Sequence, residues 1–497
     1  MAILAVLLFG LTLEARARDF FFVVGGGPEP WSNQVSIEHN VEFYQATMAR
    51  IRDTPRSETL FFASGQSGQP DVCHIAALDV PEANRLLALA SGDRRDLRLA
   101  FRRHQLSGVN GGILRHQVLE KLRGMSRELG PGDRLLLYFT GHGGKGSPVT
   151  NGCFYAWNRE RITVRDLAEV LDRYSPEVEV MLVMVQCYSG SFANILFTGG
   201  DPEHGLASHR RAGFFGTIAT RPAAGCTADM KKEDYEEYST YFWSAVGGID
   251  RTGKDVLAGD LDGDGKQTFV DAHVHALLHS PTIDISMRTS DEYLRRFGRE
   301  KGKESTGEDR LLAWDSPYAS LLEGAGPDLV PLLEGLSRKL NLSGEDRVAV
   351  AARLAESVEQ GRRRNQQEIR KMEGAVRNAA VQIGQALMVQ WPFLRSAWHP
   401  ETQALLTTGG NELITFMTSH REFGNYAELS RMLKDLKEKD LAEERRWAGL
   451  QRFVRAAESA ALAHNLQFEK DSSLRSRYDE LLRLERWEVA PTGKIPK

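Results

Sequence analysis

The chain of 497 residues has few cysteines and none of the spacings that give cysteine a structural role. The four cysteines are Cys73, Cys153, Cys187 and Cys226, and no two of them form a CxxC pair. A disulfide scaffold, a zinc ribbon and a thioredoxin-type motif are therefore unsupported. If Cys187 works as a thiolate, at most one disulfide can form among the other three, and several pairings stay open.

A strong charge of one sign is also missing. The formal net charge is −4, which gives no reason to expect nucleic acid or an anionic membrane as a partner. Neither Gly-Lys-Ser/Thr nor GxGxxG accompanies the three glycines at 25–27, so a nucleotide site is disfavoured. Beyond the amino terminus no apolar run is long enough to cross a bilayer, and no membrane span is expected in the mature chain.

Residues 1–17 have the pattern of a secretory signal peptide. Ala2 to Leu13 is almost wholly apolar, and Ala15-Arg16-Ala17 has the small-x-small form of a signal-peptidase site, although no Lys or Arg precedes the apolar run. We therefore expect a secreted or periplasmic protein. The alternative is an additional hydrophobic element packed on a cytoplasmic protein.

Two hydrophobic runs organise the chain, and each leads into a reactive residue. Residues 134–140 precede His142, and residues 178–185 precede Cys187. Short apolar runs bounded by glycine and charge predict buried parallel strands, and the helical spacing of 162–174 predicts the crossover helix between them. Neighbouring parallel strands end on the same rim of a sheet, where open α/β sheets place their sites. The sequence thus predicts that the histidine and the cysteine face each other across that rim.

A thiol and an imidazole on one rim predict a nucleophile pair. A thiol attacks a carbonyl only as the thiolate, so it needs a neighbouring base. We expect Cys187 to be the nucleophile and His142 to transfer the proton. The backbone N–H groups of Gly143 and Cys187 are the predicted oxyanion donors, because glycine lets the backbone approach a substrate carbonyl. Taken singly, each residue is more simply a core histidine or a structural thiol, but the matching strand ends favour the catalytic interpretation.

The flanking sequence predicts the rest of a three-layer domain. Other strands are expected at 19–25, 58–63 and 212–219, and other helices at 40–52, 113–129, 239–246 and 270–278. The loop 220–227, at the carboxyl end of a strand, is expected to form a wall of a substrate pocket. Alternating strands and helices indicate an α/β domain with a mostly parallel sheet, which we place at residues 18–320.

Strand signals vanish after Pro327. A capping-box-like start at 343–346 opens a helix that ends near Pro392, and more helices are expected at 401–419 (interrupted by two glycines), 426–437 and 441–465. Residues 321–497 are therefore predicted to be an all-α domain for a protein partner or for regulation. Its charge runs at 362–364 and 434–446 are expected to be solvated faces.

Two motifs carry a family resemblance. Tyr138-Phe-Thr-Gly-His142-Gly-Gly and Gln186-Cys187-Tyr-Ser-Gly-Ser191 resemble the signature blocks of caspase-like (clan CD) cysteine peptidases, which include metacaspases and the legumain family. The first block is closer to metacaspases, and Ser-Gly-Ser after the cysteine is closer to legumain. The resemblance implies a caspase-like fold in which Cys187 attacks a peptide carbonyl, His142 transfers protons and no third member is essential.

The chain departs from this family at positions that set specificity. The relatives carry an acidic residue two positions before the cysteine, where this chain has Val185. The segment 31–38 offers no arginine where legumains have one for their pocket. Ser239 falls where relatives place pocket-wall residues and is the candidate substrate contact. Cleavage after asparagine, or after lysine or arginine, is therefore not implied.

Residues 260–271 resemble an EF-hand calcium loop. Asp260, Asp262 and Asp264 occupy positions one, three and five, Gly265 allows the sharp turn, and Asp271 takes position twelve. The main-chain carbonyl of Lys266 would be a further ligand. Position twelve is shorter than the usual glutamate, and position eight is polar. We expect one Ca²⁺ site, with a solvent-exposed Asp/Gly turn as the alternative, and no organic cofactor.

The sequence as a whole favours a cysteine endopeptidase acting on polypeptides, with calcium dependence left open. One alternative is a catalytically inactive caspase-like scaffold that binds calcium. Another is a transpeptidase or ligase, because the thioacyl-enzyme is common to both reactions and only the acceptor differs.

Overall fold

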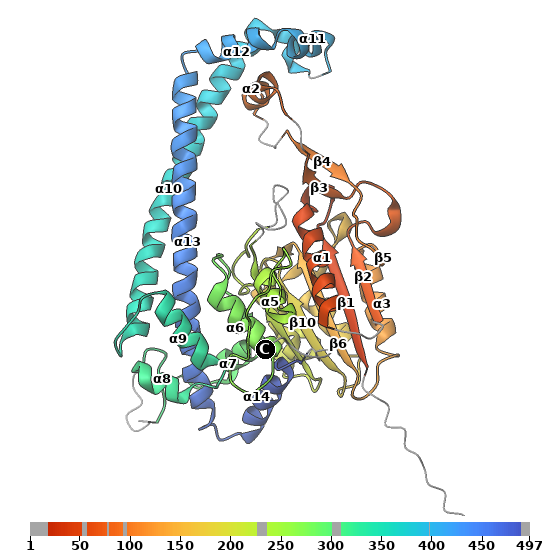
Figure 1. Cartoon of the computed structure of the whole chain (residues 1–497), viewed down its shortest axis with the longest axis vertical. Coiled ribbons are helices and arrows are strands. Elements are labelled where there is room, and N and C mark those ends of the chain that lie inside the picture. The colour runs from red at the N-terminus through yellow and green to blue at the C-terminus, as the bar shows by residue number, and fades with distance from the viewer. Residues whose placement is uncertain are drawn as a thin grey trace, which may run out of the picture.

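The computed structural model describes residues 18–51, 57–76, 79–92, 97–225, 236–300, 310–396 and 398–488. The predicted signal peptide at 1–17 and Cys226 lie outside this part of the chain, as does most of the expected linker at 298–309. An α/β body and a helical region with a long two-helix hairpin make up the molecule (Figure 1). Among the described residues, none of the helices is both long enough and apolar enough to cross a bilayer.

The body is built on a seven-stranded sheet in the order β12-β11-β10-β6-β1-β2-β5. All neighbours pair in parallel except β12, which is antiparallel to β11 at the edge. The strands are β1 (Asp19–Gly26), β2 (Ser57–Phe62), β5 (Val109–Gly111), β6 (Arg134–Gly141), β10 (Glu179–Met184), β11 (Arg211–Phe215) and β12 (Met287–Arg288). The predicted mostly parallel sheet is confirmed.

Helices cover both faces of this sheet, which gives the three layers. Along β1, Phe21 and Val23 join the apolar cluster under one set of helices, whereas Phe20 and Phe22 join the cluster on the opposite face. This alternation follows from the two-residue period of a strand. The body helices are α1 (Val35–Ile51), α3 (Arg115–Met125), α4 (Val164–Leu171), α5 (Tyr238–Gly247), α6 (Phe269–His279) and α7 (Thr289–Phe297).

The body contains two smaller sheets besides the central one. One pairs β3 (Val72–Ile75) with β4 (Leu99–Arg102), and α2 (Glu82–Ala90) lies between them in sequence. The other contains β7 (Gly143–Gly144), β8 (Cys153–Tyr155) and β9 (Arg161–Thr163). The sequence patterns used above did not predict these short elements, since runs of two to four residues carry no clear periodicity.

In the described part of the chain the carboxyl-terminal region is built of helices, as expected, and only Glu488 forms a β-bridge, with Thr268. Its helices are α8 (Tyr318–Gly324), α9 (Leu329–Lys339), α10 (Arg347–Gln390), α11 (Pro400–Thr408), α12 (Gly410–Ser419), α13 (Phe423–Leu466) and α14 (Ser472–Glu485). The helices expected at 426–437 and 441–465 are one continuous helix, because the intervening Glu438-Lys-Asp-Leu441 contains no helix breaker. The pair Gly409-Gly410 does divide α11 from α12.

The helical region shares an apolar core with the body. One cluster of buried side chains extends from Phe21 in β1 through Phe269 in α6 to Leu333 in α9 and Phe453 in α13. The lower part of the α10–α13 hairpin is therefore packed against the body. The domain boundary at 320/321 stays a prediction.

Candidate active site

His142 and Cys187 lie at equivalent places beyond two neighbouring strands. β6 and β10 pair in parallel, and their last paired residues are Phe139 and Met184. Each reactive residue follows three positions later, so the offset of 45 along the ladder (184 − 139) equals the offset of the pair (187 − 142). The crossover through α4 thus brings both residues to one rim of the sheet.

The backbones of the two motifs touch at Gly143. A Cβ atom placed on Gly143 would lie 2.0 Å from the carbonyl oxygen of Cys187 and 2.6 Å from Cγ of Gln186. Only glycine fits this contact. Since the Tyr155 N–H donates to the carbonyl of His142, Gly143 occupies the following non-hydrogen-bonded position of the antiparallel β7–β8 ladder. Its N–H is therefore directed away from β8, as an oxyanion donor requires; that role stays a prediction.

His142 is half-buried, and its Nε2 lies between two oxygens. It is 2.7 Å from the main-chain oxygen of Ser32 and 3.0 Å from Oε1 of Gln34. A carbonyl oxygen only accepts, so Nε2 carries a proton and Nδ1 is the basic nitrogen when the ring is neutral. Burial lowers the pKa of His142, and the bond with Ser32 opposes that shift only in part. The ring is therefore neutral at pH 7.

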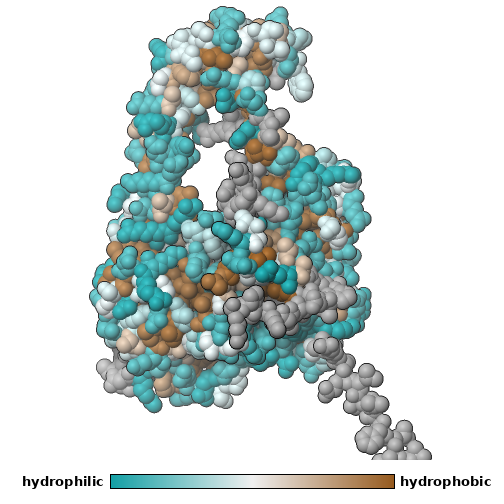
Figure 2. Space-filling model, viewed as in Figure 1, coloured by the Kyte–Doolittle hydropathy of each residue, from teal (hydrophilic) through white to brown (hydrophobic). Residues whose placement is uncertain are grey.

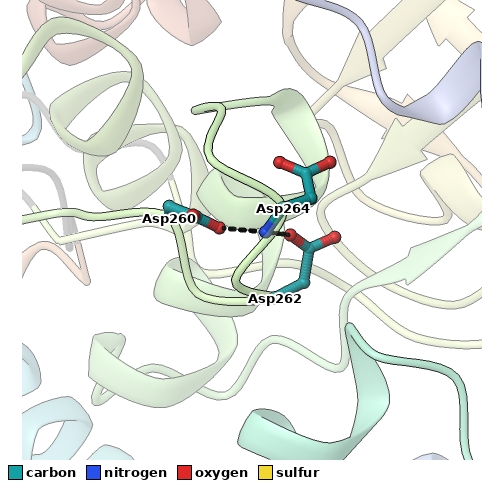
Figure 3. Close-up of side chains that lie close together, drawn as sticks. All are labelled: Asp260, Asp262 and Asp264. Atoms are coloured by element: carbon teal, nitrogen blue, oxygen red, sulfur yellow. Dashed lines mark hydrogen bonds between the residues drawn. The ribbon is translucent and has the colours of Figure 1, made fainter.

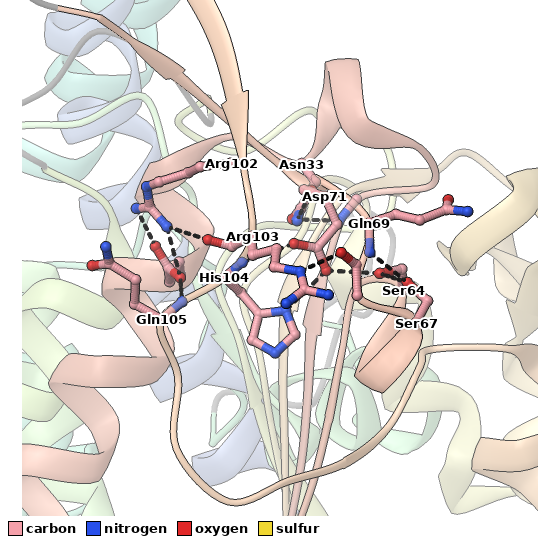
Figure 4. Close-up of polar contacts among 12 residues, drawn as sticks. Asn33, Ser64, Ser67, Gln69, Asp71, Arg102, Arg103, His104 and Gln105 are labelled. Atoms are coloured by element: carbon pink, nitrogen blue, oxygen red, sulfur yellow. Dashed lines mark hydrogen bonds and ion pairs between the residues drawn. The ribbon is translucent and has the colours of Figure 1, made fainter.

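A buried polar network fixes the segment 32–34, which contacts His142 (Figure 4). The Asn33 side chain accepts from the Gly27 N–H and donates to the main-chain oxygen of Asp71. The Asp71 carboxylate accepts from the Ser64 hydroxyl and from both the N–H and Nδ1 of His104, each at 2.9 Å. Burial by itself would raise the pKa of Asp71, but these hydrogen bonds outweigh it and lower the pKa.

Cys187 is a half-buried free thiol. Its Sγ accepts from the N–H of Ala223 at 3.3 Å, and the next residue, Tyr188, donates its N–H to the main-chain oxygen of Arg221. Tyr188 is left-handed (φ 59°), which turns the chain sharply after the thiol. Burial raises the pKa of Cys187, and the Ala223 N–H opposes that rise only in part. At neutral pH the pair is a thiol and an imidazole.

The loop that touches the thiol is held from outside by the helical region. The Arg221 guanidinium pairs with Glu444 of α13 and lies 4.5 Å from the centre of the Trp447 ring. Glu444 also pairs at 2.7 Å with Arg362 of α10, whose side chain is only 4% exposed. The expectation that 362–364 forms a solvated face is therefore wrong at Arg362, because α13 brings acidic side chains against it.

An arginine of α13 also supports this loop. Arg452 is buried and donates to the main-chain oxygens of Ser280, Thr282 and Asp284 at 2.7, 3.0 and 2.7 Å. The Asp284 carboxylate in turn accepts the N–H of Ala224 at 2.6 Å. The loop 220–227 was expected to be a pocket wall, and residues 226 and 227 lie outside the described part of the chain. Gln34, Arg221 and Ala223 themselves were not singled out, since nothing local in the sequence marks them.

The predicted pocket residues lie deeper. The Ser239 hydroxyl is fully buried and donates to Glu237. Val185, two positions before the cysteine, is 5% exposed and belongs to the core under α1 and α5. Ser239 as a substrate contact stays a prediction. Cys73 and Cys153 are buried free thiols in the described part of the chain, so no bond joins these two.

In the loop 260–271 the structure gathers three of the predicted ligands (Figure 3). One carboxylate oxygen each from Asp260, Asp262 and Asp264 lies within 4.8 Å of the others. Asp260 also accepts the N–H groups of Gly263 and Gly265, both at 2.7 Å, and these bonds lower its pKa.

Other side-chain contacts surround this cluster, and Asp271, the fourth predicted carboxylate ligand, takes part in them. The Asp271 carboxylate caps α6 through the N–H and hydroxyl of Thr268 and accepts the Leu261 N–H. The Lys266 ammonium pairs with Glu488. Asp262 pairs at 3.0 Å with Arg486. Three carboxylates in a glycine turn suit a hard divalent cation. Asp271 is not one of these three, and its carboxylate caps α6.

Comparison with known proteins bears on the segment that carries both motifs. Residues 116–242 match the model of the peptidase C13 family. This legumain-like segment is about a quarter of the chain, and it contains both His142 and Cys187. The resemblance to caspase-like cysteine peptidases is thereby confirmed, and the match supports a cysteine-type peptidase that acts on polypeptides.

Other comparisons add little. No curated protein matches the chain. Among solved structures, protein GSU0716 from Geobacter sulfurreducens aligns with 10% identity over 42% of this chain and 76% of its own, at a TM-score of 0.25. So low a score carries no argument about fold or function.

Proposed function

We propose that the protein is a cysteine endopeptidase in which Cys187 is the nucleophile and His142 the proton-transferring partner. The observation that carries the proposal is the shared ladder offset of β6 and β10, which sets both residues at one rim inside the C13-like segment. The Gly143–Cys187 backbone contact supports the proposal, because it brings the segment that contains His142 against the segment that contains Cys187.

The reaction would follow from these groups. Nδ1 of His142 takes the thiol proton as Sγ of Cys187 attacks the peptide carbonyl carbon, and the N–H groups of Gly143 and Cys187 receive the developing oxyanion. The C–N bond then breaks, the imidazolium returns the proton to the leaving amine, and a thioester remains. Water, losing a proton to the imidazole, hydrolyses that thioester and restores the thiol.

The test is removal of the nucleophile. Cys187→Ala should lower kcat/KM on a peptide library by about 10⁴-fold or more, as expected for loss of a nucleophile. Cys73→Ala, which removes a buried thiol from β3, is the matched control and should keep at least half of the activity. Equal turnover by Cys187→Ala and the wild type would contradict the proposal.

We also propose that the loop 260–271 binds Ca²⁺ through Asp260, Asp262, Asp264 and the Lys266 carbonyl. The closeness of three carboxylates supports it, since a cation would relieve their mutual repulsion. Titration calorimetry should detect one site, and Asp264→Asn should weaken it on the order of tenfold by removing one ligand charge. Asp315→Asn, at an exposed site, should leave the affinity unchanged. An absence of binding at millimolar Ca²⁺ would rule the site out.

A further inference from the structure

The helical hairpin and an insertion of the body form a closed ring, in which residues 77–78 and 93–96, which link the insertion's helix α2 to β3 and β4, lie outside the described part of the chain. α10 and α13 extend from the body to a tip made of α11 and α12 (Figure 1). α2, carried on β3 and β4, meets this tip. The space-filling view shows open space between the hairpin on one side and β3 and β4 on the other (Figure 2).

The ring is closed by packed side chains and by a backbone contact. An apolar cluster joins α2 to α10, α11 and α12, and its buried members are Ala83, Leu86, Ile383, Leu387, Leu394, Leu405, Leu413 and Met417. At Gly384 a Cβ atom would lie 2.2 Å from the main-chain oxygen of Ala90, so α10 and α2 approach as closely as glycine allows. Such packing is typical of a formed interface.

The ring contacts the body on both sides of the candidate active site, through β3 beside His142 and through α13 beside Cys187. On one side β3 is bridged to Gln34 through Cys73, and Gln34 contacts His142. On the other side Glu444 of α13 pairs with Arg221, whose main-chain oxygen accepts the N–H that follows Cys187. The ring therefore borders the rim on which both reactive residues lie.

We propose, resting on the function proposed above, that the substrate is an extended, unfolded polypeptide segment that passes through this ring to reach Cys187. A peptide bond must leave its own secondary structure before its carbonyl can meet a thiol and two N–H donors. A closed ring adds a size limit to that demand, and we infer that its opening admits a single extended chain and excludes a folded domain. The ring thus selects substrates by their lack of structure.

A disulfide across the tip tests the proposal. The Cβ position of Gly410 lies 3.5 Å from Cβ of Ala83, at the short end of the separation of about 3.5–4.5 Å that a disulfide needs. The double variant Ala83→Cys, Gly410→Cys can therefore be locked by oxidation and released by reductant. The wild type receives the same treatments.

The substrates differ only in their ends. Each carries one cleavage sequence in an unstructured linker of roughly 40 residues, which spans up to about 130 Å when extended. A compact folded domain is fused to one end or to both ends. Only the first fusion has a free end that can enter a closed ring. A short peptide with the same sequence reports whether the site itself is intact.

The locked protein should cleave the doubly capped fusion at least tenfold more slowly than the singly capped one. Reduction of the disulfide should decrease this difference in cleavage rate between the two fusions. The short peptide should be cleaved at the same rate before and after reduction. Equal cleavage of both fusions by the locked protein would overturn the proposal. Failure of every form to cleave the short peptide would instead refute the proposed endopeptidase function.

An opening variant gives the converse test. Gly384→Ala forces a Cβ against Ala90 at the tip, whereas Gly374→Ala adds the same methyl in the same helix with nothing within 4 Å. Gly384→Ala should speed cleavage of the doubly capped fusion severalfold and leave the short peptide unchanged. Gly374→Ala should match the wild type. Identical behaviour of the two variants would count against the ring as the selective element.

Discussion

The histidine and the cysteine of the candidate site are supported in different ways. The histidine is held by its own surroundings: Ser32 and Gln34 contact the ring, and the Asn33–Asp71–His104 network fixes that segment within the body. The loop beside the cysteine is held by α13, more than 200 residues away in sequence, through Glu444 and Arg452. The helical region is therefore part of what shapes the nucleophile, whereas the base is shaped without it.

The largest effect is expected where the two sides meet. Gly143→Ala places a methyl group 2.0 Å from the Cys187 carbonyl oxygen, so the motifs must separate and the predicted oxyanion donor must move. We expect kcat/KM on a short peptide to fall about 100-fold or more, the usual cost of losing one such donor. Gly130→Ala, which meets no atom within 4 Å, is the control. Full activity of Gly143→Ala would mean that the two loops move independently.

A smaller effect confined to the histidine side is expected from Asp71→Asn. The amide cannot accept all three hydrogen bonds of the carboxylate, so the segment that positions His142 loosens. Turnover should fall about tenfold, in line with the usual effect of losing a supporting partner. The rate at which iodoacetamide alkylates Cys187 should not change. The exposed Asp79→Asn serves as control. An altered alkylation rate in Asp71→Asn would show that the histidine side and the cysteine side are not supported independently.

Glu444→Gln should act on the cysteine side and, unlike Asp71→Asn, should change the alkylation rate of Cys187. This change removes the charge shared by Arg221 and the buried Arg362, and the loop beside the thiol loses its ion pair with α13 while keeping the contacts through Trp447 and Arg452. We expect a severalfold change in the alkylation rate of Cys187. The unfolding midpoint should also fall, because the buried Arg362 keeps only its longer ion pairs with Glu359 and Asp440, at 3.3 and 3.6 Å. Glu443→Gln, at the adjacent position of the same helix, should change neither. An unaltered alkylation rate in Glu444→Gln would show that α13 does not act on the thiol.

The same contrast explains what the sequence could and could not predict. His142 and Cys187 each follow a strongly apolar strand and have glycine close by, so local pattern and one crossover were enough to place them on one rim. Arg221 and Arg452 belong to no local pattern, and Glu444 lies in the charge run 434–446 that was expected to be solvated. Their pairing depends on where α13 packs. From the sequence alone, a charged helix face is predicted to be exposed to solvent, because the residues that pack against it are not known.

The smallest effect concerns the protonation of the pair. Burial raises the pKa of the Cys187 thiol and lowers the pKa of His142, so at pH 7 both are uncharged instead of forming a thiolate–imidazolium pair. The thiolate fraction then grows about tenfold per pH unit below the thiol pKa, and the alkylation rate should rise with that slope from pH 6.5 to 8.5.

In a neutral pair the imidazole contributes little to the resting thiolate population. His142→Ala should therefore change the alkylation rate by less than about threefold at any pH in this range, although it abolishes turnover, because proton transfer is needed only once a carbonyl is under attack. A charged pair predicts the reverse: a rate that is flat with pH in the wild type and that falls steeply in His142→Ala. Mass spectrometry of the peptide that contains Cys187 separates the two outcomes.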